Sequence, residues 1–238
     1  MVFNSNNFAF NNIYSKDMNI HLVSESTDIL NDYGIPFNIE EDNLDVTLSF
    51  CYANEDNPLV WDYDTVVDFL GWMITDDFCE FISEDNEDII YFLKGVGYQK
   101  RFTNNMTGII DVTFKVLSPY GFKHYIREIS SGEKVFDIYN YSNIDNAYKP
   151  VITLSRISSK NITLTNTTTN KEPLSITEAN SLGTVYIDNL TGTITDRNRS
   201  SKLTNSNRSW IELRKGLNKF SVDGACNIVV EAYYPIMV

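Results

Sequence analysis

Side chains that could do acid–base or metal chemistry are scarce in this sequence. It contains two histidines, His21 and His124, and no second histidine or cysteine lies near either of them in the chain. The three cysteines, Cys51, Cys79 and Cys226, are too scattered for the paired ligands of a zinc site, and their odd number does not suit a disulfide framework. We therefore predict three free thiols and no catalytic, metal-binding or cofactor-binding residue.

Three other patterns could be taken for binding sites. The acidic tracts EEDNLD and SEDNED lack the central glycine and terminal glutamate of an EF-hand calcium loop, so we interpret them as solvated turns. The glycine pair in Gly95-Val96-Gly97 is too short a motif for a phosphate loop and predicts a β-bulge. Trp210 could stack on a sugar ring, but packing is the commoner role for such a residue. Trp72 is expected to pack against a sheet or a neighbouring subunit.

The charge is distributed unevenly along the chain. The 238 residues carry 19 Lys/Arg and 32 Asp/Glu, a formal net charge of -13. Residues 1–120 hold 5 basic and 21 acidic residues, whereas residues 121–238 hold 14 and 11. A net negative chain repels phosphate backbones, which argues against duplex nucleic acid as a ligand, and no apolar run is long enough for membrane insertion. Length and charge together predict two domains, residues 1–130 and residues 131–238.

Apolar periodicity predicts an α+β domain in the first half. Residues 44–52 alternate between apolar and polar side chains, as in a half-buried strand. Asp62 or Asp64 can cap a helix, whose inward stripe is expected to contain Val67, Leu70, Ile74 and Phe78, flanked by Val66 and Met73. Residues 81–102 predict a hairpin that turns at SEDNED, and residues 110–116 alternate as a further strand.

The second half shows only strand signals, each four to eight residues long and bounded by turn residues. This spacing is typical of a β-sandwich of about 100 residues. The predicted fold class is therefore mostly β, with one helix in the first domain. The strands are expected at residues 135–141, 150–156, 161–166, 173–177, 184–188, 193–195, 208–213, 218–222 and 226–233.

The ordered series of segments resembles the phage distal tail proteins (Dit). The opening NFAFNNIYSKDMNIHLV, the helix FLGWMITDDF and the strand IIDVTFKVLSPYGF are similar to the N-terminal domain of that family. The stretches YKPVITLSRISSKNITLTNTTTNKEPLSI, SWIELRKGLNKFSV and CNIVVEAYYP are similar to its second domain. The resemblance covers nearly the whole chain and rests on the order of the patterns and on the length.

The resemblance implies a structural virion protein. Distal tail proteins form a hexameric ring at the tail tip, and their second domain is a galectin-like β-sandwich that projects from it. The implied partners are further copies of the chain, the tail tube protein, the hub protein or tail-associated lysin and, in some members, a receptor-binding protein. Genomic DNA would pass through the ring without specific contacts. The implied location is the tail tip of the virion, after assembly in the host cytoplasm. Residues 134–238 suffice for the sandwich alone, so no inserted carbohydrate-binding module or arm is expected.

In such a ring, part of the negative charge of residues 1–120 should face the lumen. An acidic channel repels phosphates and lets the duplex slide, whereas a basic channel would grip it. The alternative is that these carboxylates only solubilise outer turns. The candidate lumen-facing residues are Glu40, Glu41, Asp42, Asp45, Glu84, Asp85, Glu87 and Asp88.

Two other classes of function stay open. The first is a carbohydrate-binding β-sandwich protein that acts in host attachment, although the galectin site needs a histidine and residues 134–238 contain none. The second is a glycosidase with two carboxylates, although no such pair is recognisable in the second half. Glycan binding and release of reducing sugar would distinguish these classes from a ring protein.

Overall fold

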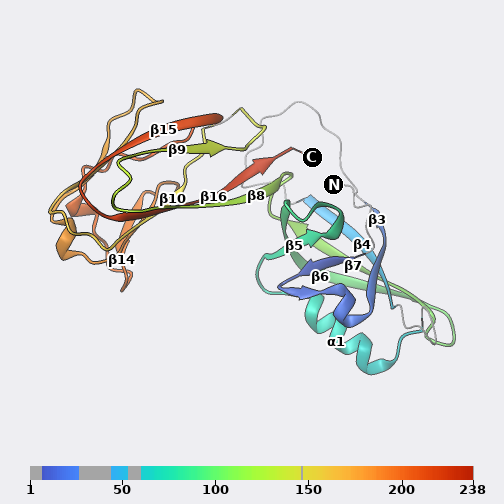
Figure 1. The fold of residues 1–238 in the computed structure, drawn as a ribbon. Helices are drawn as coiled ribbons and strands as arrows, with labels where there is room; N and C mark the ends of the chain where they lie inside the picture. Colours follow the sequence, from blue (N-terminus) through green and yellow to red (C-terminus); the bar gives the residue numbers. More distant parts are fainter. Residues whose placement is uncertain (1–6, 27–43, 53–59, 146, 238) are drawn as a thin grey trace. The chain divides into compact units, whose positions relative to one another are not determined.

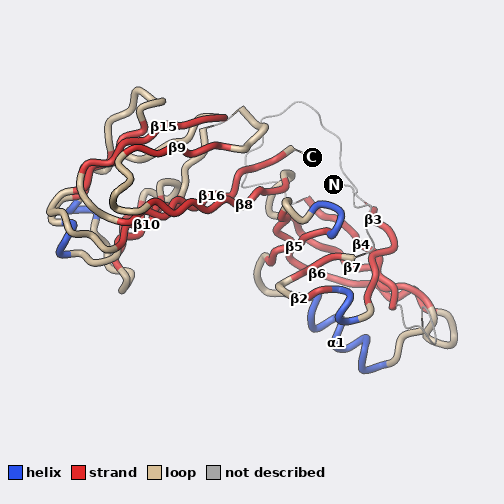
Figure 2. The backbone as a smooth tube through the Cα atoms, in the orientation of Figure 1, coloured by secondary structure: helices blue, strands red, loops and turns tan. Residues whose placement is uncertain are grey.

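The computed structural model describes residues 7–26, 44–52, 60–145 and 147–237. Antiparallel strands dominate these ranges, which confirms the predicted mostly β fold class (Figures 1 and 2). The chain forms two compact units, Met1–Gly121 with Met237–Val238, and Phe122–Ile236. The second unit therefore begins at Phe122, whereas the sequence placed the boundary after residue 130.

The first unit contains seven strands in the antiparallel order β3-β4-β7-β6-β5-β1-β2. Short 3-10 turns at Ser15–Met18 and Glu84–Asn86 precede β3 and β6. The elements are β1 (Phe8–Phe10), β2 (Ile13–Tyr14), β3 (Ile20–Ser26), β4 (Leu44–Tyr52), α1 (Tyr63–Met73), β5 (Cys79–Ser83), β6 (Ile90–Phe102) and β7 (Gly108–Val116).

The predicted strands of this unit are confirmed, including the bulge. β4 and β7 pair in a register that aligns Val46 with Phe114, so their apolar side chains share one face. The pairing of β6 with β7 shifts register between Gly95 and Gly97. A Cβ at Gly95 would lie 1.9 Å from the carbonyl oxygen of Met73, so the bulge lets the strand approach the end of α1.

The helix buries a different face from the one predicted. Asp62 caps it, because one carboxylate oxygen accepts a 2.8 Å hydrogen bond from the backbone N–H of Thr65. The buried residues are Val66, Phe69, Trp72 and Met73, whereas Val67 is 50% exposed, Ile74 is 38% exposed, and Leu70 and Phe78 are half-buried. The expectation of a Val67/Leu70/Ile74/Phe78 stripe was therefore wrong. Both stripes have helical spacing, and the larger apolar area of Phe69 and Trp72 decides which one faces the sheet.

Aromatic side chains fill the core of the first unit. The ring centroids of Phe8 on β1 and Phe50 on β4 lie 5.3 Å apart, although three strands separate β1 from β4 in the sheet order. The sheet therefore curls around its core. Trp72 stacks on Phe8 with centroids 5.6 Å apart, and its indole N–H donates a 2.8 Å hydrogen bond to the carbonyl oxygen of Phe10. Trp72 packs against the sheet, as predicted.

The second unit is a sandwich of two antiparallel sheets. One sheet has the order β14-β13-β10-β16-β8, and the other has the order β12-β11-β15-β9. The sequence did not predict β8, because the residues of this strand do not alternate between apolar and polar types. Most of its side chains are exposed or half-buried. The strands are β8 (Gly121–Ile129), β9 (Val135–Asn140), β10 (Val151–Ser155), β11 (Ile162–Asn166), β12 (Leu174–Ile176), β13 (Val185–Asp188), β14 (Thr193–Asp196), β15 (Gly216–Asp223) and β16 (Asn227–Ile236). Two short 3-10 turns, η3 (Ala179–Ser181) and η4 (Leu203–Asn205), lie between them.

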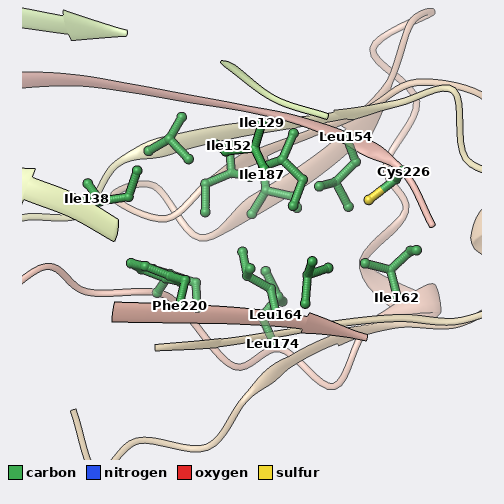
Figure 3. Close-up of a cluster of buried hydrophobic side chains, with 14 of the residues drawn as sticks. Ile129, Ile138, Ile152, Leu154, Ile162, Leu164, Leu174, Ile187, Phe220 and Cys226 are labelled. Carbon is green, nitrogen blue, oxygen red and sulfur yellow. The ribbon is translucent and has the colours of Figure 1, made fainter. Parts of the chain in front are cut away.

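Aliphatic side chains from both sheets meet in the core of this unit. Figure 3 shows Ile152, Leu154 and Ile187 of one sheet facing Leu164 and Phe220 of the other. All five are at most 2% exposed. This packing of two inner faces explains the alternating burial along each strand.

The strand predicted at residues 208–213 is absent. Leu213 forms an isolated bridge with Tyr148, and the rest of the segment pairs with no strand. Buried asparagine side chains take the place of a strand ladder: Asn140 donates to the carbonyl oxygen of Leu213 at 3.2 Å, and Asn166 donates to that of Glu212 at 2.8 Å.

Asn189 and Asn218 complete this arrangement, which we call the asparagine clamp (Asn140, Asn166, Asn189 and Asn218). The side-chain oxygen of Asn189 accepts from the backbone N–H of Ile211 at 2.8 Å. Asn218 donates to the carbonyl oxygen of Arg214 at 2.7 Å and accepts from its N–H at 2.9 Å. The segment therefore has satisfied backbone groups without belonging to a sheet.

Candidate functional site

The acidic turn between β5 and β6 carries four of the predicted lumen-facing residues. Glu84, Asp85, Glu87 and Asp88 are all exposed. The backbone N–H of Glu84 donates to the carbonyl oxygen of Asn7 at 3.1 Å, and the side-chain amide of Asn7 donates to the Glu84 carboxylate at 2.7 Å. The turn is therefore anchored to the start of β1.

Asp45 lies at the same end of the sheet as this turn. The register aligns Leu44 of β4 with Val116 at the end of β7, and Val116 with Leu93 near the start of β6, which follows the acidic turn. Asp45 is exposed and sits opposite Lys115, which in turn faces Lys94. The structure thus brings five of the eight predicted carboxylates to one end of the sheet and adds two lysines beside Asp45. Glu40, Glu41 and Asp42 lie outside the described residues.

A pocket of about 250 Å³ opens beside the acidic turn. Its walls include Phe8, Tyr14, Lys16, Glu84 and Glu87. Lys16 forms a cationic wall of the pocket, and Glu84 and Glu87 form an anionic wall. The ammonium group of Lys16 lies 5.3 Å from the centre of the Tyr14 ring. Neither the pocket nor the Lys94/Lys115 pair was found from sequence, because both depend on strand register.

The sheet of the first unit ends in two strands that each have one described neighbour. β3 pairs with β4, and β2 pairs with β1. Exposed apolar side chains lie on both: Val23 on β3 is 51% exposed, and Ile13 and Tyr14 on β2 are 40% and 55% exposed. Edge strands with exposed apolar residues are suited to pairing with another chain.

Both histidines lie on strands, and Cys51 and Cys226 are buried. His21 lies half-buried on β3. His124 on β8 contacts the Glu231 carboxylate at 2.9 Å and stacks on Tyr233, with ring centroids 4.3 Å apart. Burial raises the pKa of the thiols of Cys51 and Cys226. Within the ranges given above, no three potential ligands gather into a metal site. None of the helices described there is long and apolar enough to cross a membrane.

Comparison with known proteins connects this geometry to phage tails. Residues 120–232, which include almost all of the second unit, match the family described as phage tail C-terminal domain. The Dit protein of phage SPP1, described as a paradigm of the hub adsorption apparatus in phages that infect Gram-positive bacteria, is similar in structure with a TM-score of 0.59 and 10% identity. That similarity covers 96% of this chain and 98% of the SPP1 chain. The predicted resemblance to the phage distal tail proteins is confirmed.

A second solved structure has the same fold. A chain of the phage P2 baseplate, in its activated conformation with calcium, aligns with a TM-score of 0.50 and 9% identity, over 94% of this chain and 97% of that one. No curated protein sequence matches the chain. The second unit thus matches a family of phage tail domains, and the fold of the whole chain is that of two chains from phage tail and baseplate structures.

Proposed function

We propose that this protein forms a ring, of six copies, at the distal end of a phage tail tube. The observation that carries the proposal is the similarity to SPP1 Dit over nearly the full length of both chains. In this role the first unit builds the ring, as the sequence predicts for residues 1–130. The second unit projects from the ring. The ring joins the tube protein to the hub or tail-associated lysin and places the protein at the tail tip.

The two sheet edges of the first unit support a ring. A closed ring needs two different surfaces on each subunit, because every copy contacts its neighbours head to tail. β2 and β3 lie at opposite ends of the strand order and expose Ile13, Tyr14 and Val23. Pairing of one edge with the other in the next copy would cover both sets of side chains.

The mass of the protein in solution tests the ring. Six copies of 27.3 kDa give about 164 kDa, which light scattering and negative-stain images can distinguish from a monomer. We expect Val23→Lys on β3 to lower the ring fraction, because a lysine on an edge strand opposes pairing. Val67→Lys on α1 is the matched control, since Val67 is 50% exposed and Val23 is 51% exposed. A monomer at every concentration, or equal loss in both variants, contradicts the edge-to-edge ring.

We also propose that the acidic end of the first unit faces the channel. The supporting observation is that Asp45, Glu84, Asp85, Glu87 and Asp88 lie at one end of one sheet, where their charges add. An acidic wall repels the phosphates of passing DNA. A density map of the assembled ring tests this, and a position of the β5–β6 turn on the outer rim would refute it without affecting the ring itself.

A further inference from the structure

The helix α1 carries apolar residues on two faces. Its inner face packs on the aromatic core, and Figure 1 shows the strands of the first unit on one side of the helix. The other face carries a second row at helical spacing, which ends at the C-cap residue and which we call the outer stripe: Tyr63, Val67, Leu70, Gly71 and Ile74. Tyr63 is 73% exposed, Val67 is 50% exposed and Ile74 is 38% exposed. The outer stripe therefore presents large apolar side chains where a surface helix usually presents polar ones.

Three members of the outer stripe, Val67, Leu70 and Ile74, belong to the pattern that predicts an inward face. The fold needs only one apolar face to attach α1 to the sheet, and Phe69 and Trp72 supply it. An additional apolar row at a spacing of three, four and seven residues is the arrangement with which a helix contacts another helix. The outer stripe is therefore a surface suited to a partner and is not required by the fold of the first unit.

No contact in the described part of the chain requires a glycine at position 71. A Cβ on Gly71 would meet no atom of another element within 4 Å, and its backbone is not in the left-handed region. Glycine in a helix interior is less stable than alanine, because it loses more backbone entropy on folding. The missing side chain leaves a notch in the outer stripe, where the backbone of a second helix can come close to α1.

The surroundings of the outer stripe are acidic. Asp64 and Asp68 directly follow Tyr63 and Val67 in the helix, are exposed, and flank the stripe on one side. Residues 17–93 contain 20 acidic residues and no lysine or arginine. An acidic flank beside an apolar stripe complements a surface that combines lysine or arginine with apolar side chains. It repels a second copy of the same helix, because the charges would be alike.

We propose that the outer stripe binds a basic, amphipathic α-helix of another protein. The apolar face of that helix covers Val67 and Ile74, and its backbone approaches α1 at Gly71. Its lysine or arginine side chains lie beside Asp64 and Asp68. The contact goes beyond the ring proposed above and does not depend on it, because the ring uses the edge strands β2 and β3.

The test measures binding of the full chain to a synthetic helical peptide of about 20 residues, with leucine and alanine along one face and lysine on the flanks. We expect Val67→Lys to weaken binding about tenfold, because it removes an apolar contact and adds a like charge. Val23→Lys on β3 is the matched control, since Val23 is 51% exposed and Val67 is 50% exposed, and it should bind as the parent does. The two variants have the reverse effects on the ring, so failure of the ring and failure of this contact are distinguishable. Equal binding by both variants, or no binding at millimolar peptide, overturns the proposal.

Replacement of Gly71 separates the contact from the stability of the helix. Gly71→Ala should raise the thermal midpoint of the first unit, because alanine restricts the unfolded chain. It should also weaken peptide binding about fivefold, because its methyl group fills the notch. Gly97→Ala on β6 is the control, since it too adds a Cβ that meets no atom within 4 Å, and it should leave binding unchanged. Binding of Gly71→Ala as tight as that of the parent would refute the docking of a helix.

Charge variants and two other peptides complete the test. Asp64→Asn/Asp68→Asn should weaken binding about tenfold at low salt, at roughly threefold for each exposed carboxylate. Asp137→Asn/Asp223→Asn removes the same charge from exposed residues of the second unit and should bind as the parent does. A peptide with glutamate in place of lysine, and polylysine without an apolar face, should both bind more weakly than the first peptide. Polylysine that binds as tightly shows nonspecific attraction, and a lower ring fraction in Val67→Lys assigns the stripe to a second copy; either result overturns the proposal.

Discussion

Replacement of Asn218 by alanine should destabilise the second unit more than any other change in the asparagine clamp. Asn218 is fully buried. Its side-chain amide donates to the carbonyl oxygens of Arg214 at 2.7 Å and Gly216 at 3.0 Å. Its side-chain oxygen accepts from the N–H of Arg214 at 2.9 Å and from the amide of Asn166 at 3.2 Å.

The expected cost follows from these four hydrogen bonds. Alanine removes all of them and leaves the opposing groups on Arg214, Gly216 and Asn166 without that partner in a partly buried environment. A net cost of about 1 kcal/mol for each bond gives about 3–4 kcal/mol of unfolding free energy. Asn218→Asp should be destabilising as well, because it keeps the shape but sets a carboxylate oxygen against two carbonyl oxygens.

Hydrogen exchange of a peptide that covers residues 208–216 is the most direct assay, together with urea unfolding of the full chain. In Asn218→Ala, the N–H of Arg214 should exchange faster before the unit unfolds globally, since its acceptor is gone. Asn198→Ala, which changes an exposed asparagine in the turn after β14, is the control and should change little. A loss below about 1 kcal/mol, with unchanged exchange at Arg214, would refute the role of the clamp.

Two other predictions test local features. Gly95→Ala should destabilise the first unit by more than about 3 kcal/mol in urea unfolding, because its Cβ would lie 1.9 Å from the Met73 carbonyl oxygen, whereas Gly97→Ala, with no atom within 4 Å, should be nearly neutral; similar effects would contradict the close approach. The backbone N–H of Ser200, first, and then Lys202 lower the pKa of Asp196, so its stabilisation of the turn is present above the unfolded-state pKa and is lost as the pH falls through the folded-state value. The protection factors of the amides of Asn198 and Ser200, taken relative to their intrinsic exchange rates at each pH, should therefore fall at acid pH in the parent, and protection factors that do not change with pH and equal those of Asp196→Asn would disprove this.

Short-range sequence patterns were sufficient to predict an element wherever one face of that element is buried and the other is solvated. The alternation in residues 44–52 and 110–116, the cap at Asp62 and the bulge at Gly95 all depend on near neighbours in the chain, and the structure has each of them. The same holds for most strands of the sandwich. Their turn residues and apolar pairs are local properties that tertiary packing did not need to override.

Only part of the candidate site can be predicted from the sequence. The acidic tract at residues 84–88 is visible in the sequence, but its position at the same end of the sheet as Asp45 depends on the register of β4, β7 and β6. The pairing of Lys115 with Asp45 depends on that register too. Such contacts join residues about 70 positions apart, and no short-range pattern encodes them.

The sequence by itself determined the fold class, the order of most elements and the charge contrast between the two halves, because these follow from composition and short-range periodicity. Only the tertiary structure decided which of two equally spaced helical stripes is buried, since the aromatic core formed by Phe8, Phe10 and Phe50 favours Phe69 and Trp72. It also decided that residues 208–213 are not a strand. Ile211 and Leu213 have the spacing of a strand, but the side-chain amides of the distant residues Asn140, Asn166 and Asn189 satisfy backbone groups that a neighbouring strand would otherwise pair.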